Sequence, residues 1–532
     1  MRKFTAKDIG AELLPILTSG LYDEPYDAVR EYVQNGIDAG ADLIRVTVAS
    51  NSAVILDNGH GMSPDVVDKA IRLGVSEKDP RTQVGFRGIG IYSALHLCDR
   101  LVVRTRDEQG RAGRIDMHFG LIRAHLAEQE AGRLRGEPAT LWLEGLLGQT
   151  VSVADDPDSP LEAPGTMVAL VGLSTDMGSR LKDRAGLETY LRNVIPLPFS
   201  PQFTWGQKIL GRFTERRIRT VAVELTHSGF TGPLHRPYTD AIFTNGRGEE
   251  PRFLEVTFGS DHSRLGFCWY CLNDASALLS DASVRGLIVK KFGFSVGDRS
   301  YLKTFYGRPI ISERVTGEVI VEDRELLPNA GRSDFEAGPA RDRFQRALTA
   351  VATRISEDAD RLWKKLRAVD LLVSARQALD GLIERIPGAS GDVDQLLALN
   401  AAISGWDQKL KPHRKFVPKE SQGELADYDR LARKAESDIK ELIETKREKR
   451  PSKVRRIVQA AREEEAETKP EARGQEPPAR LLDVVDRLGI STTPAMQALL
   501  SSVDDLLLKP NLSEEVYGTG LAELLERMED LL

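Results

Sequence analysis

The chain has few cysteines, no long apolar run and no large excess of charge. Its 532 residues include three cysteines, too few for a disulfide framework. No stretch reaches the roughly 18 apolar residues of a membrane-spanning helix, and the first residues lack the apolar segment of a secretory signal. The net charge of −7 gives no bulk argument for binding nucleic acid. We therefore expect a cytoplasmic protein without a membrane partner.

Two of the cysteines form a Cys-x-x-Cys motif, Cys268 and Cys271, among aromatic residues typical of a buried strand. The chain has no second pair that would complete a zinc site. A structural role is therefore favoured over a metal or redox role. The apolar fraction of 41% is enough for two or three domains with ordinary cores.

A P-loop is also missing, although the chain has a glycine-rich stretch from Gly85 to Gly90. This stretch, Gly-Phe-Arg-Gly-Ile-Gly, is not followed by Gly-Lys-Ser/Thr. It runs into an apolar segment, 91–97, and glycines before a helix N-terminus leave N–H groups free for phosphate oxygens. Alone, this motif is weak evidence for a nucleotide site.

A second motif places Glu31, Asn35 and Asp38 on one face of a predicted helix, at positions i, i+4 and i+7. Carboxylate and amide oxygens suit a hydrated magnesium ion, and a carboxylate near a terminal phosphate can orient or deprotonate water. The alternative is an ordinary solvated helix face.

A third motif, Asp57-Asn-Gly59-His-Gly61-Met62, follows the apolar run 53–56, which predicts a buried strand. An acid at a strand end, next to glycines that allow close backbone approach, suits the amino group of adenine. The alternative is a simple Asp-Asn-Gly turn.

In their order and spacing the three motifs resemble those of the GHKL ATPases, which include gyrase B, HtpG-type chaperones, histidine kinases, MutL and MORC proteins. The resemblance implies ATP and Mg²⁺ as ligands, with Glu31 as general base, Asn35 as magnesium ligand and Asp57 as the adenine acceptor. A fourth element, Gly165-Thr166, places a threonine near adenine. The other residues expected to contact nucleotide are Asp38, Gly59, Gly61, Met62, Lys78, Gly85, Gly88, Ile89, Gly90 and Thr166.

The segment 76–83 is the expected mobile lid over this site. Its Lys78 and Arg81 would either meet phosphates or remain solvated charges. The resemblance implies that residues 1–185 form a Bergerat α/β sandwich, with helices covering one face of a mixed sheet. Predicted strands include 139–144, 149–153 and 166–173.

Residues 186–337 are expected to form a second α/β domain of the ribosomal-S5-like type, with strands at 219–225, 252–258, 264–271 and 285–292. Its end, Leu-Pro328-Asn-Ala-Gly-Arg332, resembles the catalytic loop of the HtpG-type middle domain. The resemblance implies that Arg332 reaches the terminal phosphate, where a guanidinium stabilises developing charge. The alternative is a surface arginine at a helix start.

The remaining chain is predicted to be mainly helical at 338–466, then a Pro-rich linker at 467–479 and a small helical module at 480–532 suited to dimerisation. A basic cluster at 446–456 indicates either a nucleic-acid patch or, as favoured here, a solvated charged helix.

Two motifs favour an HtpG-like ATPase with slow turnover: Gly90-Ile-Tyr-Ser-Ala-Leu95 and the Arg332 loop. The leading hypothesis is a homodimeric chaperone clamp on a protein client. Gly85-Phe-Arg-Gly88 is instead written as in MutL proteins, so the alternative is a MutL- or MORC-like clamp on DNA in repair or defence. A pseudo-ATPase is disfavoured because Glu31 and Asn35 are both present.

Overall fold

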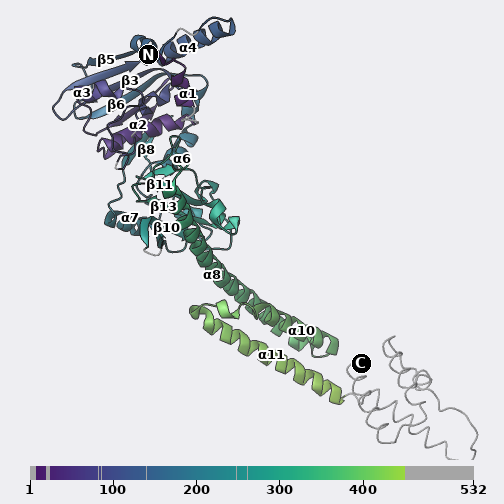
Figure 1. Cartoon of the computed structure of the whole chain (residues 1–532). Coiled ribbons are helices and arrows are strands. Elements are labelled where there is room, and N and C mark those ends of the chain that lie inside the picture. Colours follow the sequence, from purple (N-terminus) through teal and green to yellow (C-terminus); the bar gives the residue numbers. More distant parts are fainter. Residues whose placement is uncertain are drawn as a thin grey trace, which may run out of the picture. The chain divides into compact units, whose positions relative to one another are not determined.

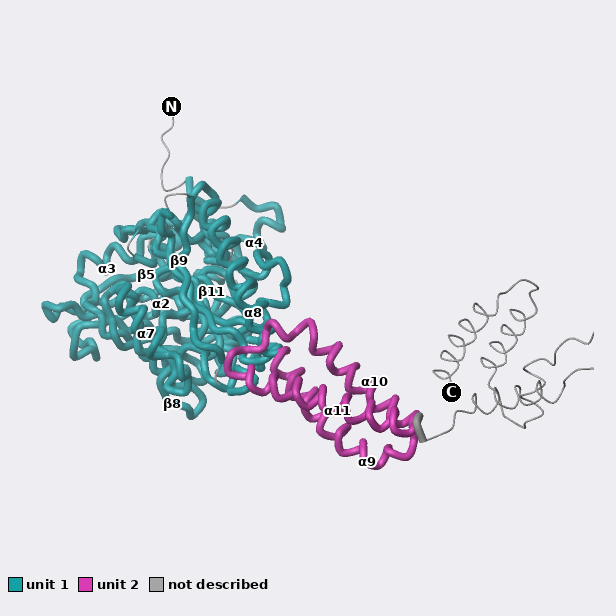
Figure 2. The backbone as a smooth tube through the Cα atoms, turned by 90° about the horizontal axis from the view of Figure 1, so that it is seen from below, with its two compact units in different colours: residues 1–366 teal, residues 367–532 magenta. Residues whose placement is uncertain are grey.

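The computed structural model describes residues 8–19, 24–81, 83–85, 87–138, 141–246, 248–259 and 262–449. The chain divides into two compact units, residues 1–366 and 367–532, coloured separately in Figure 2. The predicted linker at 467–479, the module at 480–532 and residues 450–456 of the basic cluster lie outside the described residues.

Unit 1 contains an eight-stranded sheet with the order β5-β4-β3-β6-β2-β1-β7-β8. Neighbouring strands are antiparallel except β1 and β7, which run parallel. In β1 and β2 every second side chain is buried, as expected for a sheet with one covered face. The strands are β1 (Leu43–Val48), β2 (Ser52–Asp57), β3 (Cys98–Arg106), β4 (Ala112–Met117), β5 (Val151–Asp155), β6 (Gly165–Leu173), β7 (Ala222–His227) and β8 (Phe230–Pro233).

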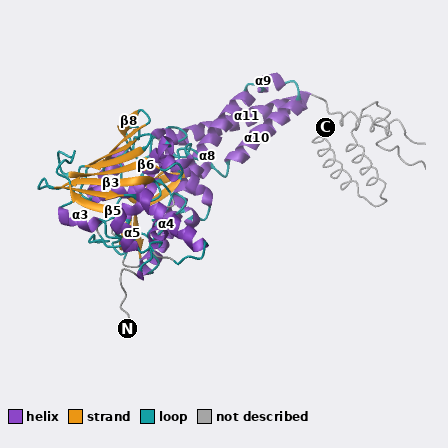
Figure 3. Cartoon of the chain, turned by 90° about the horizontal axis from the view of Figure 1, so that it is seen from above, coloured by secondary structure: helices purple, strands orange, loops and turns teal. Residues whose placement is uncertain are grey.

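Helices pack on this sheet and enclose the first core (Figures 1 and 3). Val29 and Val33 of α2 and Leu187 of α6 are fully buried in one cluster with Ile44 and Leu170 of the strands. Because α2 turns these valines to the sheet, its polar residues at Glu31 and Asn35 face elsewhere. The helices are α1 (Leu13–Ser19), α2 (Tyr26–Asp38), α3 (Pro64–Ala70), α4 (Phe119–Leu134), α5 (Leu143–Thr150) and α6 (Arg184–Val194).

A second sheet in unit 1 has five strands in the order β12-β11-β13-β10-β9. Its strands are β9 (Arg252–Phe258), β10 (Ser263–Leu272), β11 (Gly286–Lys291), β12 (Phe294–Val296) and β13 (Val315–Val321). Helix α7 (Gly206–Glu215) packs on one face, and the first half of α8 (Pro339–Ile383) packs on the other. The mixed α/β class expected from the sequence, with a GHKL-type sheet and a helical C-terminal region, is confirmed.

The Cys-x-x-Cys motif lies on β10, and its two cysteines point to opposite faces of the second sheet. Cys268 belongs to the core under α8, and Cys271 belongs to the core under α7. Both thiols are free and buried, and burial raises the pKa of each. This geometry supports the structural role expected for the pair.

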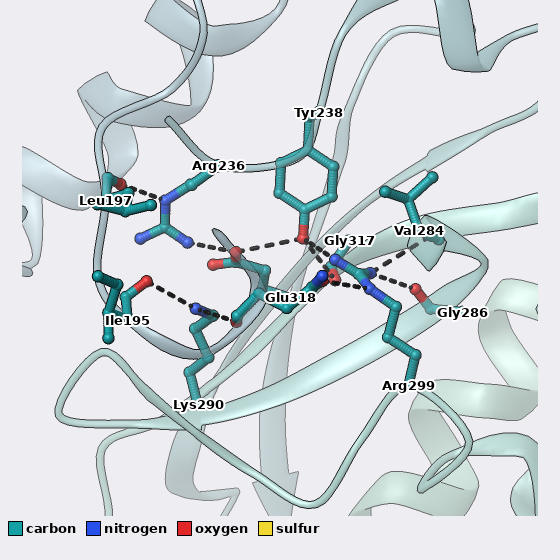
Figure 4. A network of polar contacts seen from close by, with 11 residues as sticks. Ile195, Leu197, Arg236, Tyr238, Val284, Gly286, Lys290, Arg299, Gly317 and Glu318 are labelled. Atoms are coloured by element: carbon teal, nitrogen blue, oxygen red, sulfur yellow. Dashed lines mark hydrogen bonds and ion pairs between the residues drawn. The ribbon is translucent and has the colours of Figure 1, made fainter. Parts of the chain in front are cut away.

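Buried charged side chains hold the chain segment that connects α6 to α7 (Figure 4). Arg236 donates from Nε to the Leu197 carbonyl over 2.7 Å and forms an ion pair with Glu318 of β13. Lys290 of β11 donates to the Ile195 carbonyl over 3.2 Å. All three charged side chains are at most 1% exposed. The second sheet is therefore bonded directly to the chain segment that leaves the first domain.

Further hydrogen bonds surround the Glu318 carboxylate. Tyr238 donates to it over 3.2 Å, and Arg299 donates to the Tyr238 hydroxyl over 3.0 Å. Burial opposes the charge of Glu318, but Arg236 and Lys290 outweigh that effect and lower its pKa overall. For Lys290 burial dominates and lowers the pKa to about 7.

Unit 2 is helical in its described part. The second half of α8 packs with α9 (Ile386–Ala389), α10 (Val393–Leu410) and α11 (Gln422–Lys449). Asp392 caps α10 by accepting from the Asp394 N–H over 3.0 Å. None of the described helices is long and apolar enough to cross a membrane.

Two elements differ from the sequence prediction. The strand predicted at 139–144 is wrong, because α5 starts at Leu143 and buries Leu146 and Thr150 at helical spacing. The strand predicted at 219–225 is β7, which pairs with β1 in the first sheet although it follows the expected boundary at 185. The pattern of apolar residues predicts a strand, but it does not predict which sheet the strand joins.

Replacing Lys290 by methionine should flatten the pH dependence of stability. In the folded protein Lys290 releases its proton at about pH 7, whereas a lysine in the unfolded chain keeps it until about pH 10.4. The unfolded state therefore binds more protons between these values, and wild-type stability rises with pH there. Denaturant unfolding at several pH values would measure a slope smaller by up to about 1.4 kcal/mol per pH unit in Lys290→Met. Equal slopes in both proteins would contradict the shift.

Candidate functional site

A cavity of about 450 Å³ opens beside α2 and the end of β2. This volume is within the range of roughly 300–1,000 Å³ that is usual for small-molecule sites. Every residue expected from the sequence to contact nucleotide lines it, with the exception of Gly59. Its walls include Glu31, Asn35, Asp38, Asp57, Gly61, Met62, Lys78, Gly85, Gly88, Ile89, Gly90, Thr166 and Arg332. Arg81 is not among the lining residues.

Helix α2 supplies the acid at the cavity wall. Glu31 is 9% exposed, and its Oε1 accepts from Arg30 Nη2 over 3.0 Å. Arg30 is itself held by Asp27, whose Oδ1 accepts from Nη1 over 2.8 Å. One carboxylate oxygen of Glu31 is thus fixed by an ion pair. The other, Oε2, lies next to Gly90, where an added Cβ would come within 3.0 Å of it.

Further along α2, two side-chain oxygens share one cation. The ammonium of Lys78 donates to Asp38 Oδ2 over 2.8 Å and to Asn35 Oδ1 over 3.1 Å. Asp38 also accepts from the backbone N–H groups of Val84 and Gly85 over 3.1 and 3.0 Å. The carboxylate therefore ties both ends of the segment 78–85 to α2. Lys78 is thus paired with α2 in this structure, and its contact with phosphate stays a prediction.

At the end of β2, Asp57 presents a buried carboxylate that is 7% exposed. Its Oδ1 accepts from the Gly59 N–H over 2.9 Å, so Gly59 supports the acid from behind the cavity. Burial raises the pKa of Asp57, and the backbone hydrogen bonds of Gly59 and Thr166 oppose that rise. Thr166 is the partner of Asp57 in the pairing of β2 with β6.

The same strands hold the adjoining turn. Thr105 of β3 accepts from the Met62 N–H over 2.8 Å and donates to the Gly165 carbonyl over 3.1 Å. The turn after β2 is therefore fixed against β3 and β6. Gly61 and Met62 line the cavity next to Asp57 because this bond holds them there.

The glycine-rich stretch forms another part of the cavity wall. Gly88 has φ +68°, a conformation that favours glycine, and an added Cβ would lie 2.4 Å from the Val75 carbonyl oxygen. Gly90 begins a short 3₁₀ helix, Gly90–Ala94. Backbone alone can therefore pass this close to Val75 and Glu31.

Arg332 reaches the cavity from the loop after β13. It is 8% exposed, and its Nη2 donates to the Val84 carbonyl over 3.2 Å. Among the described residues its buried Nη1 has no hydrogen-bond partner. Burial lowers the pKa of Arg332 to about 10, Arg30 adds to the decrease, and Glu31 opposes it. Its backbone is left-handed, with φ +56°, a costly conformation for a residue other than glycine.

Sequence reasoning missed several residues at the site. Gln34 lines the cavity, and its buried Oε1 has no partner among the described residues. Arg30 contacts Glu31, and Arg87 bonds the segment that contains Arg332. Arg30 precedes Glu31 and Gln34 precedes Asn35 in α2, so their position on this helix was the available signal. Nothing local indicates the partner of Arg87.

The donor set fits a nucleotide with a hard cation. Asn35 Oδ1 and Asp38 Oδ2 already contact the Lys78 ammonium, and oxygen ligands of this kind suit magnesium. The unpartnered Nη1 of Arg332 suits a phosphate oxygen, and Gly88 lets the backbone of the glycine-rich stretch lie close to its neighbours. Asp57 offers a buried acceptor at the opposite wall.

Comparison with known proteins identifies a family that matches the first part of the chain. Residues 23–130 match the family described as histidine kinase-, DNA gyrase B-, and HSP90-like ATPase. The DNA mismatch repair protein MutL of Sinorhizobium fredii is 34% identical over 117 residues, which are 20% of this chain and 19% of that protein. MutL of Aquifex pyrophilus is 28% identical over 120 residues, 20% of this chain and 28% of that protein.

The match thus spans 19% and 28% of the length of these two relatives. One solved structure, described as the N terminal domain of a DNA repair protein, aligns with 66% of this chain and 98% of its own chain. Its sequence identity is 13% and its TM-score is 0.38.

The prediction of an HtpG-like chaperone is wrong, because the curated relatives of this domain are MutL proteins. The misleading signals were the Gly90–Leu95 stretch and the Arg332 loop, whereas Gly85-Phe-Arg-Gly88 indicates MutL. Both stretches form the same wall of the cavity, so neither alone separates the branches. The chain contains a GHKL-superfamily ATPase domain, with homologues among the MutL proteins.

Proposed function

We propose that this protein is a MutL-like ATPase that binds and hydrolyses ATP to close and reopen a dimeric clamp on duplex DNA. The observation that carries the proposal is the cavity in which Glu31, Asn35, Asp57 and Arg332 converge. The relatives support the DNA part, since their name places them in DNA mismatch repair. They match over only about a fifth of their length, so the activity of the whole protein is part of the proposal.

Adenine recognition is assigned to the end of β2. The buried carboxylate of Asp57 accepts a hydrogen bond from the adenine amino group, and Thr166 lies beside it in the strand pairing. Met62 and Val168 supply apolar contact with the base from the same wall. The Gly59 N–H fixes the Asp57 carboxylate, so its orientation is set before the base arrives.

Hydrolysis is assigned to Glu31. Arg30 holds Oε1, which leaves Oε2 to orient a water molecule and accept its proton. Asn35 would hold Mg²⁺ together with phosphate oxygens, and the metal would neutralise phosphate charge. Lys78 would leave Asn35 to allow this. Arg332 directs its unpartnered Nη1 at the charge that develops on the terminal phosphoryl group.

Asp57→Asn should weaken ATP binding by roughly ten- to a hundredfold, because an amide disrupts a buried acceptor that makes a charge-assisted hydrogen bond. Isothermal titration of the full chain with ATP measures this loss. Asp158→Asn, at an exposed aspartate that does not line the cavity, is the matched control and should bind normally. Unchanged affinity in Asp57→Asn would remove the adenine assignment.

Glu31→Ala should still bind ATP but lose hydrolysis by roughly a hundredfold or more, since it removes the general base. Phosphate release and equilibrium ATP binding are measured on the same preparations. Glu24→Ala, which removes an exposed glutamate near the start of α2, serves as the control. Hydrolysis that persists in Glu31→Ala would sink the assignment of the base.

Duplex DNA should stimulate the wild-type ATPase, and the stimulation should fall steeply between about 50 and 200 mM salt, because contacts to phosphates release counterions. ATPase assays with and without duplex DNA across this range provide the measurement, with Glu31→Ala to subtract background. The same rates with and without DNA at every salt concentration would leave an ATPase but no DNA clamp.

A further inference from the structure

The loop that carries Arg332 is joined to the glycine-rich stretch by contacts from Arg87. We call residues 328–336 the arginine loop. Arg87 Nη2 donates to the Pro328 carbonyl over 3.0 Å and forms an ion pair with Glu336 over 2.6 Å. Arg332 returns a bond from the loop to the Val84 carbonyl over 3.2 Å. Segments about 240 residues apart in sequence thus meet at three bonds.

The arginine loop is held together internally. Asn329 donates from its N–H to the Asp334 carbonyl over 2.8 Å, and Glu336 donates to the Leu327 carbonyl over 2.8 Å. The Gly297 N–H donates to the Arg332 carbonyl over 2.7 Å. These bonds preserve the left-handed backbone of Arg332. The loop is therefore placed as one body, and its contacts with neighbours decide where the guanidinium lies.

Arg87 contacts both ends of the arginine loop. Pro328 and Glu336 are the first and last residues of the loop, and the bridge between Pro328 and Phe335 brings the two ends together. A planar guanidinium suits a carbonyl and a carboxylate presented side by side. The Arg87 and Glu336 side chains are 33% and 49% exposed, so solvent weakens the ion pair.

We propose that Arg87 is a positioning residue: it holds the arginine loop against the glycine-rich stretch so that Arg332 stays directed at the cavity. The glycine-rich stretch and the arginine loop then move together, because displacement of Gly88 displaces Arg87 and with it both ends of the loop. The proposal rests on the function assigned to Arg332 above. A competing role for Arg87, which also lines the cavity, is direct contact with phosphate.

Arg87→Gln, Glu336→Gln and the double variant separate these roles in the full chain. Positioning predicts that each single variant lowers kcat roughly threefold to tenfold with the affinity for ATP unchanged within twofold. The double variant should be no worse than Arg87→Gln alone, since that variant already removes the contact with Glu336. Arg87→Lys, which keeps the charge, should recover part of the loss. In an Arg332→Ala background, Arg87→Gln should have no further effect.

Arg343→Gln is the matched control. Arg343 pairs with Glu325 over 2.9 Å at 35% exposure, but it does not line the cavity. Its kcat should equal that of the wild type. Weaker ATP binding in Arg87→Gln together with a silent Glu336→Gln would overturn the proposal in favour of a phosphate ligand. Additive losses in the double variant would also overturn it.

Hydrogen exchange of the nucleotide-free protein tests the contact without relying on ATP hydrolysis. Exchange at residues 329–336 should accelerate in Arg87→Gln and Glu336→Gln but not in Arg343→Gln. If the wild type hydrolysed no ATP, the proposed function would fail, and exchange alone would decide whether Arg87 holds the loop. Unchanged exchange in both variants would refute the holding contact.

Discussion

The placement of Arg332 depends on the buried carboxylate of Glu318 on β13, the strand that precedes the arginine loop. Arg236 pairs with Glu318 and at the same time donates a hydrogen bond to the Leu197 carbonyl, in the chain segment between α6 and α7. Breaking a buried ion pair leaves an uncompensated charge, which is strongly destabilising. The second sheet is therefore held against the segment between α6 and α7. The arginine loop follows β13, so its start is fixed by the same contacts.

From this fixed point the cavity is built by two kinds of contact. Backbone pairing of β2 with β6 sets Asp57 beside Thr166 in the sheet. Side-chain contacts set the opposite wall, where Asp38 holds Val84 and Arg332 bonds the same residue. The strand-held residues Asp57 and Thr166 are assigned to adenine, and the residues held by side-chain contacts are assigned to the phosphates. Side-chain contacts can change more easily than strand pairing, which suits a site that reorganises during ATP hydrolysis.

Sequence reasoning found the candidate site because most of its residues belong to three motifs within one short region. Helical spacing alone placed Glu31 and Asn35 on one face. It could not pair Lys78 with Asp38, since both are common on solvated surfaces, nor Arg87 with Glu336 across 249 residues. The fold class followed from the family resemblance together with strand and helix patterns, but the sheet that β7 joins depends on a parallel pairing that no local pattern encodes.

In the proposed function, a magnesium ion that binds Asn35 would replace the Lys78 ammonium at the C-terminal end of α2. This ammonium already neutralises Asp38 and occupies the amide oxygen of Asn35. A cation that takes this oxygen replaces another cation, so the net free energy is the difference between two coordinated states, and no bare charge has to be desolvated first. The displaced ammonium is covalently part of the segment beside the cavity. Exchange of one ion for another would thus also release the Lys78 end of that segment, while Asp38 still holds Val84 and Gly85.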